Sequence, residues 1–293
     1  MLSEVSNLDF LLESFIREDV GAGDITTCAT VPVDRIAEAT FVVKEGGILA
    51  GLQAAERVFG LVDDMLSVRW SCTDGDLARP NVTIGTVRGR AQSILKAERV
   101  ALNILQRMSG IATATRKMVE ATRPHKARIR DTRKTAPGLR ALDKWAVRLG
   151  GGENHRYGLY DMMLIKENHV AAAGGMRAAI EAACSFRHTS AGHTRIEVEV
   201  RTLNELQEAL DTGGFDELLL DNMVDVDAAG IVDTARLSDA VTLIDGRYTA
   251  EASGNVTFTT VAAIAATGVD YISSGALTHS VRALDISMQI RPA

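Results

Sequence analysis

Short apolar segments alternate with helical patterns along the second half of the chain, and this alternation constrains the fold more than any other feature. Each apolar segment is followed by a stretch with helical spacing of its apolar residues. Because repeated strand–helix units with apolar strands form parallel sheets, five or six such units predict an α/β barrel. The expected strands are 128–132, 162–166, 195–200, 217–220, 249–252 and 271–273, and the expected helices begin at Gly138, Met176, Leu203, Val226 and Phe258.

The first half of the chain has a different pattern. An amphipathic helix is expected over 8–18, and extended segments are expected over 39–44, 66–71 and 82–90. Breaks such as Gly46-Gly47 and Asp74-Gly75 separate these segments, which is typical of an antiparallel sheet. A long helical pattern covers 93–123, with a possible break near Ser109-Gly110.

Positive charge is concentrated between Arg123 and Arg156. This window holds ten Lys or Arg residues against three acids, a charge of +7, whereas the whole chain carries −6, so the rest of the chain sums to −13. Nucleic-acid-binding proteins usually have a basic surface overall. The pattern therefore favours a small polyanion as the ligand, and it predicts an enzyme rather than a nucleic-acid-binding protein.

Composition narrows the location of the protein. No apolar run approaches the ~20 residues that span a bilayer. The first residues carry acids, unlike a basic secretory signal. Cys28, Cys72 and Cys184 are too widely spaced for a CxxC metal site and too few for a disulfide framework. We therefore expect a cytoplasmic protein that does not bind membranes.

Polar residues follow the expected strands at the points where those strands end. In α/β barrels the chemistry takes place at the carboxyl ends of the strands. We therefore expect one site to gather the residues at these ends, which are Arg133, Lys134, Lys166, Glu199, Asp221, Ser253, Gly254, Ser274 and Gly275.

The expected strand ends offer both acids and small residues. Glu199 and Asp221 could hold Mg²⁺ or accept hydrogen bonds from ribose hydroxyls, or they could be structural carboxylates paired with a cation. Glu197 shares its strand side with Glu199, because side chains alternate along a strand. The small residues after the last two expected strands are typical of a phosphate site.

Histidines and Lys166 leave several interpretations open. His155 and His169 could act as general acids or bases, and His279 could bind phosphate, although isolated histidines are more often structural. Lys166 could form a Schiff base or remain protonated and bind an anion. The neighbouring arginines favour the second role, since a Schiff base does not explain their number.

Specific sequence blocks resemble the quinolinate phosphoribosyltransferase family, the decarboxylating type II phosphoribosyltransferases of NAD biosynthesis. The blocks occur in order over nearly the whole chain: LLESFIREDVGAGDITT, AERVALNILQRMSGIAT, DTRKTAPGLR, KWAVRLGGGENHR, GLYDMMLIKENH, IEVEV, LLLDN, SGN and GALTHSVRALDISM. The resemblance implies an N-terminal open α/β sandwich over 1–110, joined to an incomplete catalytic α/β barrel over 111–280. The tail 281–293 would return to the first domain.

The resemblance also implies a role for each candidate residue. It assigns Arg133, His155, Arg156 and Lys166 to the carboxylates of quinolinate, with Arg99 supplied by the partner in a homodimer whose active sites are shared. Lys134 would contact the pyrophosphate side of phosphoribosyl pyrophosphate, and Glu199 and Asp221 would hold the ribose and Mg²⁺. Lys134, Lys166, Glu199 and Asp221 form the implied catalytic set. Further substrate contacts would come from Ser253, Gly254, Asn255, Ser274, Gly275 and His279.

Several alternatives stay open at this point. A related type II enzyme could act on nicotinate, a Schiff-base lyase could use Lys166, and a non-catalytic barrel could bind anions alone. A paralogue associated with molybdenum transport shares the fold, but Asn168 and His169 after Lys166 favour the quinolinate enzyme. Type I phosphoribosyltransferases are disfavoured, because they carry two adjacent acids where LLLDNM has one.

Overall fold

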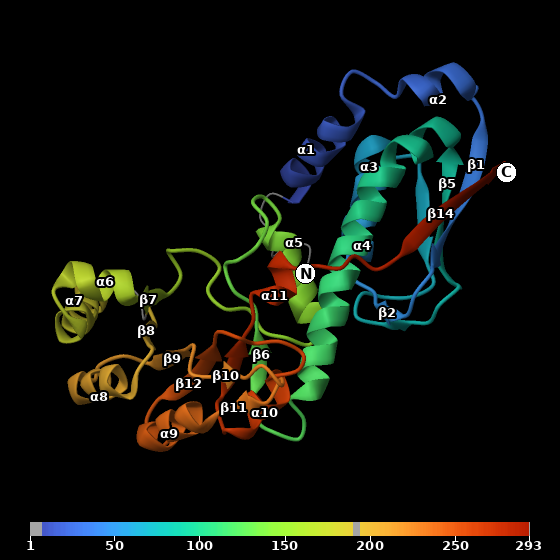
Figure 1. Cartoon of the computed structure of the whole chain (residues 1–293). Coiled ribbons are helices and arrows are strands. Elements are labelled where there is room, and N and C mark those ends of the chain that lie inside the picture. Colours follow the sequence, from blue (N-terminus) through green and yellow to red (C-terminus); the bar gives the residue numbers. More distant parts are fainter. Residues whose placement is uncertain (1–7, 190–193, 293) are drawn as a thin grey trace. The chain divides into compact units, whose positions relative to one another are not determined.

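The computed structural model describes residues 8–189 and 194–292, and the chain divides into two compact units. Unit 1 comprises Met1–Arg116, Ala136–Gly151 and Ser280–Ala293, and unit 2 comprises Lys117–Thr135 and Gly152–His279. The coloured ribbon in Figure 1 follows the chain through both. This grouping differs from a cut at residue 110, because Asp143 and the carbonyl of Gly150 accept hydrogen bonds from Arg107 and Arg116 of unit 1.

Unit 1 is built on a four-stranded antiparallel sheet with the order β14-β1-β5-β3. Alternate residues of β1 are buried, and Phe41 packs against Phe59 and Trp70 with ring centroids 5.8 and 5.0 Å apart. Alternation of buried and less buried residues is what a sheet with one covered face requires. The elements of unit 1 are α1 (Leu8–Val20), α2 (Ile25–Thr30), β1 (Ile36–Val43), β2 (Gly47–Ile48), α3 (Leu52–Val62), β3 (Ser67–Trp70), β4 (Leu77–Ala78), β5 (Val82–Arg90), α5 (Arg140–Leu149) and β14 (Ile286–Pro292).

The helix α4 (Ala91–Ala121) is continuous, so the expected break near Ser109-Gly110 is wrong. Both residues serve packing instead. The Ser109 hydroxyl accepts a hydrogen bond from the backbone N–H of Ala50 at 3.0 Å. A Cβ at Gly110 would collide with the backbone of Arg282, so the glycine permits a close approach of two segments.

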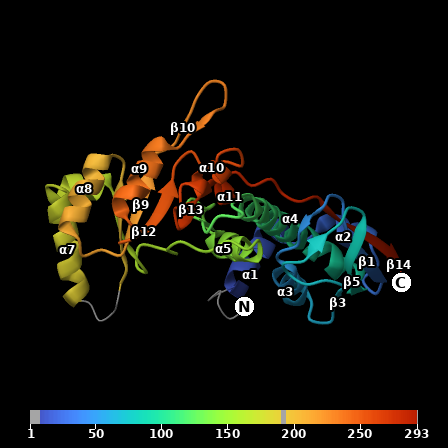
Figure 2. The same ribbon diagram turned by 90° about the horizontal axis from the view of Figure 1, so that it is seen from below.

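Unit 2 is built on a six-stranded parallel sheet with the order β6-β13-β12-β9-β8-β7. Every residue of β8 is buried, as expected for strands covered on both faces. Figure 2 shows the same sheet with helices α7, α8 and α9 beside it. The elements are β6 (Arg128–Arg130), β7 (Met163–Ile165), α6 (Glu167–Ala173), α7 (Met176–Thr189), β8 (Ile196–Val200), α8 (Leu203–Thr212), β9 (Glu217–Asp221), α9 (Ala235–Ile244), β12 (Thr249–Ser253), α10 (Val261–Ala266), β13 (Tyr271–Ser273) and α11 (Ala276–His279).

Three helices begin later than the sequence predicted, and the one expected from Gly138 begins at Arg140. The prediction of a helix from Val226 is wrong. A short hairpin of β10 (Asp225–Val226) and β11 (Val232–Asp233) lies there, and α9 begins at Ala235. The Asp227 carboxylate accepts backbone hydrogen bonds from Ala229 and Ile231 and thereby forms the turn. The helix expected from Phe258 begins at Val261.

None of the helices in the described parts of the chain is long and apolar enough to cross a membrane.

Candidate active site

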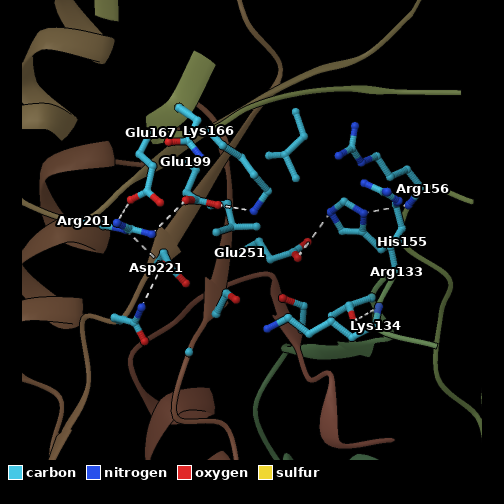
Figure 3. Close-up of a pocket in the computed structure, with 18 residues that line it drawn as sticks. Arg133, Lys134, His155, Arg156, Lys166, Glu167, Glu199, Arg201, Asp221 and Glu251 are labelled. Carbon is cyan, nitrogen blue, oxygen red and sulfur yellow. Dashed lines mark hydrogen bonds and ion pairs between the residues drawn. The ribbon is translucent and has the colours of Figure 1, made fainter. Parts of the chain in front are cut away.

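A cavity of about 580 Å³ lies within unit 2 at the carboxyl ends of its strands. Figure 3 shows Arg133, Lys134, His155 and Arg156 on one side of it and Lys166, Glu167, Glu199, Arg201 and Asp221 on the other. All six strands of the parallel sheet contribute a residue from their carboxyl end or from the loop that follows, as the sequence predicted from barrel geometry.

Nine of the fourteen predicted site residues line this cavity. They are Arg133, Lys134, His155, Arg156, Lys166, Glu199, Asp221, Ser253 and Gly254. The other five, which do not line it, are Arg99, Asn255, Ser274, Gly275 and His279. Arg99 is exposed on α4 in unit 1, whereas the remaining four belong to unit 2.

Gly275 and helix α11 lie against Lys134. Thr278, in α11, donates a hydrogen bond to the Lys134 carbonyl at 2.8 Å. A Cβ at Gly275 would lie 2.8 Å from Cδ of Lys134 and 3.0 Å from Cδ2 of His279, so these three residues are packed together. The backbone N–H of Ser274 donates to the Arg130 carbonyl, and the Asn255 side chain donates to the Val224 carbonyl.

Two guanidinium groups meet at one wall of the cavity. Burial lowers the pKa of Arg156, and repulsion from Arg133 lowers it further. The Arg156 side chain also donates a hydrogen bond to the Met162 carbonyl at 3.1 Å, which fixes its position. An anion bound between two such groups would relieve their repulsion, and a carboxylate matches the fork of a guanidinium.

Lys166 sits at the opposite wall, one residue after β7. Its backbone N–H donates to Nδ1 of His169 at 2.9 Å, and its ammonium contacts Oε2 of Glu199 at 2.5 Å. His169 therefore shapes the start of α6 and does not line the cavity. The ion pair keeps the ammonium over the carboxyl end of β8.

Asp221 is the last residue of β9, and Glu199 is the next-to-last residue of the neighbouring strand β8. The Arg201 guanidinium contacts both, with its Nε 3.3 Å from Oδ2 of Asp221 and its Nη2 3.6 Å from Oε1 of Glu199. Asn222 donates a further hydrogen bond to Asp221 at 2.8 Å. A Cβ at Gly254, whose φ is +85°, would lie 2.8 Å from the backbone nitrogen of Asn222, so only glycine permits this close approach.

A network of buried charged residues lies beneath the cavity. Glu197 and Glu251 are fully buried, and both lie near Nε2 of His155, at 2.8 and 3.7 Å. The Arg130 guanidinium bonds to Glu251 at 2.5 Å and to Glu217 at 2.8 Å, and it lies over the Tyr271 ring at 3.2 Å from the centroid. Arg195 contacts Glu217 as well. Buried charges require such pairing, because desolvation is costly.

His155 uses both ring nitrogens inside the protein. Its Nδ1 accepts a hydrogen bond from the backbone N–H of Arg156 at 2.7 Å, so the ring proton is on Nε2, which faces Glu197. His155, Glu197 and Glu251 could geometrically hold a metal ion. However, Glu251 is already paired with the Arg130 guanidinium, and Nδ1 of His155 is already bonded to the backbone of Arg156. The arrangement therefore fits a histidine that positions Arg156 better than a metal site.

Glu251 should make stability depend on pH. Burial raises the pKa of Glu251 above its ordinary value of 4.5, and repulsion from Glu197 raises it further. Because the folded state binds this proton more tightly than the unfolded state does, the associated stability is full below about pH 4.5 and is lost as pH rises toward the folded pKa. The variant Glu251→Gln cannot ionise. The free energy of unfolding of Glu251→Gln, measured in urea, should therefore increase relative to that of the wild type as the pH rises from 4.5.

The exposed Glu181→Gln provides a matched control for this measurement, since its side chain is 64% exposed. It should leave the pH profile of stability unchanged. Parallel profiles for Glu251→Gln and the wild type would contradict the raised pKa.

The cations of the window 123–156 do not gather at one site, so the predicted positive cluster is wrong for most of this window. Only Arg133, Lys134 and Arg156 of its ten cations line the cavity. Several of the others pair elsewhere or belong to unit 1; in unit 2, Arg128 binds Glu153 and Lys126 binds Asp270. The cavity itself has five Lys or Arg residues against four acids, namely Arg133, Lys134, Arg156, Lys166 and Arg201 against Glu167, Glu199, Asp221 and Glu251.

Sequence reasoning missed three charged residues of the cavity. Glu167, Arg201 and Glu251 line it, although none was a candidate. The two-residue alternation along β8, extended by one step, could have indicated Arg201 beside Glu197 and Glu199. Glu251 lies within the apolar strand β12 and carried a similar signal, since an acid in a buried strand needs a partner.

The acids at the strand ends suit a hard divalent cation. Mg²⁺ prefers oxygen ligands and takes one or two carboxylates together with substrate oxygens. One guanidinium reaches both Glu199 and Asp221, so the two carboxylates are close enough to share a cation.

Parallel strands with clustered cations and paired carboxylates at their carboxyl ends define an α/β-barrel enzyme site for an anionic substrate. The family models for quinolinate phosphoribosyl transferase match this chain over residues 24–109 (N-terminal domain) and 111–289 (C-terminal domain). The chain belongs to the quinolinate phosphoribosyltransferase family.

Individual relatives agree with this assignment. The chain is 49% identical over 290 residues to quinolinate phosphoribosyltransferase [decarboxylating] 1b of Nicotiana tabacum, covering 97% of this chain and 82% of the relative. It is 42% identical over 281 residues to the probable nicotinate-nucleotide pyrophosphorylase [carboxylating] of Bacillus subtilis, covering 96% and 92%. The crystal structure of NadC from Streptococcus pyogenes superposes with a TM-score of 0.89 at 39% identity, covering 98% and 97%.

Proposed function

We propose that the chain converts quinolinate and phosphoribosyl pyrophosphate into nicotinate mononucleotide, CO₂ and pyrophosphate. The observation that carries the proposal is the convergence of Arg133, Arg156 and Lys166 with Glu199 and Asp221 on one cavity in a member of this family. Relatives that are 42–49% identical are named for quinolinate phosphoribosyltransferase or for nicotinate-nucleotide pyrophosphorylase activity.

Quinolinate would bind at the wall formed by Arg133 and Arg156. Its two carboxylates match the two guanidiniums there, where burial and the neighbouring Arg133 lower the pKa of Arg156. Lys166 would add a third positive group from the opposite wall. His155 would hold Arg156 in place through its ring nitrogen, and it lines the cavity where a ring substrate could contact it.

Phosphoribosyl pyrophosphate would extend from Lys134 toward the ends of β9 and β12. The small residues Ser253 and Gly254 leave room for phosphate at the end of β12, and Lys134 supplies a positive charge for the pyrophosphate. Glu199 and Asp221 would accept hydrogen bonds from the ribose hydroxyls.

The reaction needs a carbocation-like ribose and an electron sink. As the bond from C1 of the ribose to the pyrophosphate oxygen breaks, Glu199 and Asp221 would stabilise the positive charge that develops on the ribose. The pyridine nitrogen then bonds to C1, and the ring becomes cationic. That ring accepts the electron pair of the C–CO₂⁻ bond as CO₂ leaves, and a proton from solvent replaces the lost carboxylate. The residues of the cavity contribute position and charge.

Mg²⁺ is proposed as the metal ion, held by Glu199 and Asp221. When bound, it would neutralise charge on the departing pyrophosphate. Its support is the pair of hard oxygen donors on neighbouring strand ends.

The test is a product assay. Purified protein is mixed with carboxyl-labelled quinolinate, phosphoribosyl pyrophosphate and MgCl₂, and nicotinate mononucleotide and labelled CO₂ are measured. Formation of both in equal amounts is expected. Quinolinate binding without CO₂ release would instead indicate an anion-binding barrel, and turnover of nicotinate in place of quinolinate would indicate the related type II enzyme.

We also propose a homodimer in which Arg99 enters the site of the partner. Its exposure on α4, outside the lining of the cavity, supports a role toward a second chain. Arg99→Ala and Lys134→Ala chains should each be nearly inactive, whereas each mixed dimer of the two has one intact site and should regain about half of wild-type activity. Co-expression with two different tags isolates the mixed dimers for this measurement.

The control for this experiment is a mixture of Lys134→Ala with Lys166→Ala. Both changes lie in the same cavity, so that mixture should stay inactive. Confirmed mixed dimers of Arg99→Ala and Lys134→Ala without activity would exclude shared sites.

The cytoplasm is the proposed location. The three cysteines, Cys28, Cys72 and Cys184, are all free, which suits a reducing compartment.

A further inference from the structure

Arg201 holds an unusual position among the charged residues of the cavity. It follows β8 directly and is about half exposed, with its guanidinium surrounded by three carboxylates. Two of these, Glu199 and Asp221, are the acids proposed to hold a divalent cation, and the third is Glu167 at the start of α6. Figure 3 shows the guanidinium between Glu167, Glu199 and Asp221.

Arg201 contacts a different acid with each of its three nitrogens. Its Nη1 contacts Glu167, and its Nε and Nη2 lie 3.3 and 3.6 Å from Asp221 and Glu199. Glu199 also has Lys166 at 2.5 Å, and Asp221 has Asn222 at 2.8 Å. Glu199 and Asp221 thus each have a second polar partner, so Glu167 is the acid that can keep Arg201 when the metal ion binds.

We propose that Arg201 is an internal cation that competes with the divalent metal ion for Glu199 and Asp221. One guanidinium and one metal ion cannot both be close to the same carboxylate oxygens without repulsion. Arg201 thus sets how much divalent cation the site requires, and Glu167 retains the side chain when the metal ion binds. This inference rests on the proposed function, since it takes Glu199 and Asp221 as the metal ligands.

The side chain can move aside without losing its main partner. Glu167 is itself about half exposed and lines the cavity, so the Arg201–Glu167 pair can persist while Nε and Nη2 turn away from the strand ends. The backbone of Arg201 is held separately, because its N–H donates to the Glu205 carboxylate at 2.7 Å. Only the side chain has to move.

The experiment measures Mn²⁺ binding to the full chain without substrates, through the loss of the free-ion signal in electron paramagnetic resonance. Arg201→Ala and Arg201→Gln should bind Mn²⁺ roughly fivefold more tightly than the wild type, the scale expected for one exposed ion pair. Arg201→Lys retains the charge and should bind nearly as weakly as the wild type. Adding Glu199→Gln to Arg201→Ala should abolish the gain.

Arg177→Ala serves as the matched control, because it removes one positive charge from unit 2 at an exposed pair with Glu181. Its Mn²⁺ affinity should equal that of the wild type. Unchanged or weaker binding in both Arg201→Ala and Arg201→Gln would overturn the proposal. Because no substrate is present, this result is independent of the product assay, so either conclusion can fail while the other stands.

Discussion

Replacing Lys166 with alanine is expected to lower kcat/KM for nicotinate mononucleotide formation by about 10²–10³-fold, the scale of losing one positioned charge in an active site. Lys166 lines the cavity between the two proposed substrates and is held over the carboxyl end of β8 by Glu199. Its removal would leave the negative charges of both substrates facing each other with one fewer cation between them. Initial rates over a range of both substrate concentrations measure the effect.

Lys126→Ala is the control for this change. Lys126 belongs to the same unit, is 62% exposed and pairs with Asp270 outside the cavity. Its kcat/KM should stay within about twofold of the wild type, since surface ion pairs contribute little. If Lys166→Ala retained more than about a tenth of wild-type kcat/KM with an intact fold, its proposed role would be lost.

Arg130→Ala should destabilise unit 2 by about 3–5 kcal/mol, because it leaves buried carboxylates without their cation. Arg130 is the closest cationic partner of the fully buried Glu251, and it also pairs with Glu217. Glu217 would retain Arg195, so the loss falls mainly on Glu251. Both tryptophans, Trp70 and Trp145, belong to unit 1, and their fluorescence would therefore report on the wrong unit.

Hydrogen exchange of peptides from β8, β9 and β12 under increasing urea measures the stability of unit 2 directly. Arg128→Ala is the matched control, since Arg128 is on the same strand but is 61% exposed and should cost less than about 1 kcal/mol. Adding Glu251→Gln to Arg130→Ala should recover part of the loss. Equal losses for Arg128→Ala and Arg130→Ala would show that the buried network does not stabilise the sheet.

The parallel sheet and the location of the site were predictable from the sequence for a common physical reason. Buried parallel strands need apolar residues on both faces, so segments such as IEVEV and LLLD contrast with the amphipathic helices between them. The carboxyl ends of parallel strands meet at one edge, and polar residues there gather without any further information. Nine predicted residues therefore line one cavity.

Features set by a turn-forming side chain or by tertiary contacts were not predictable in this way. The spacing around Val226 suits a helix, but the Asp227 carboxylate closes a turn and favours a hairpin instead. Net charge along the sequence gave no indication that Arg130 would be buried while Arg128, two residues earlier on the same side of β6, is exposed. The burial of Arg130 depends on acids far away in the sequence, such as Glu251.

The strand β14 has a consequence for how the protein is made. It forms seven residue pairs with β1, although all of unit 2 is translated between them. Until residues 286–292 emerge from the ribosome, the backbone groups along one edge of β1 have no partner strand. Exposed strand edges promote association with other chains. Nascent chains paused before residue 286 should therefore recruit chaperones at β1, even after the catalytic unit has folded.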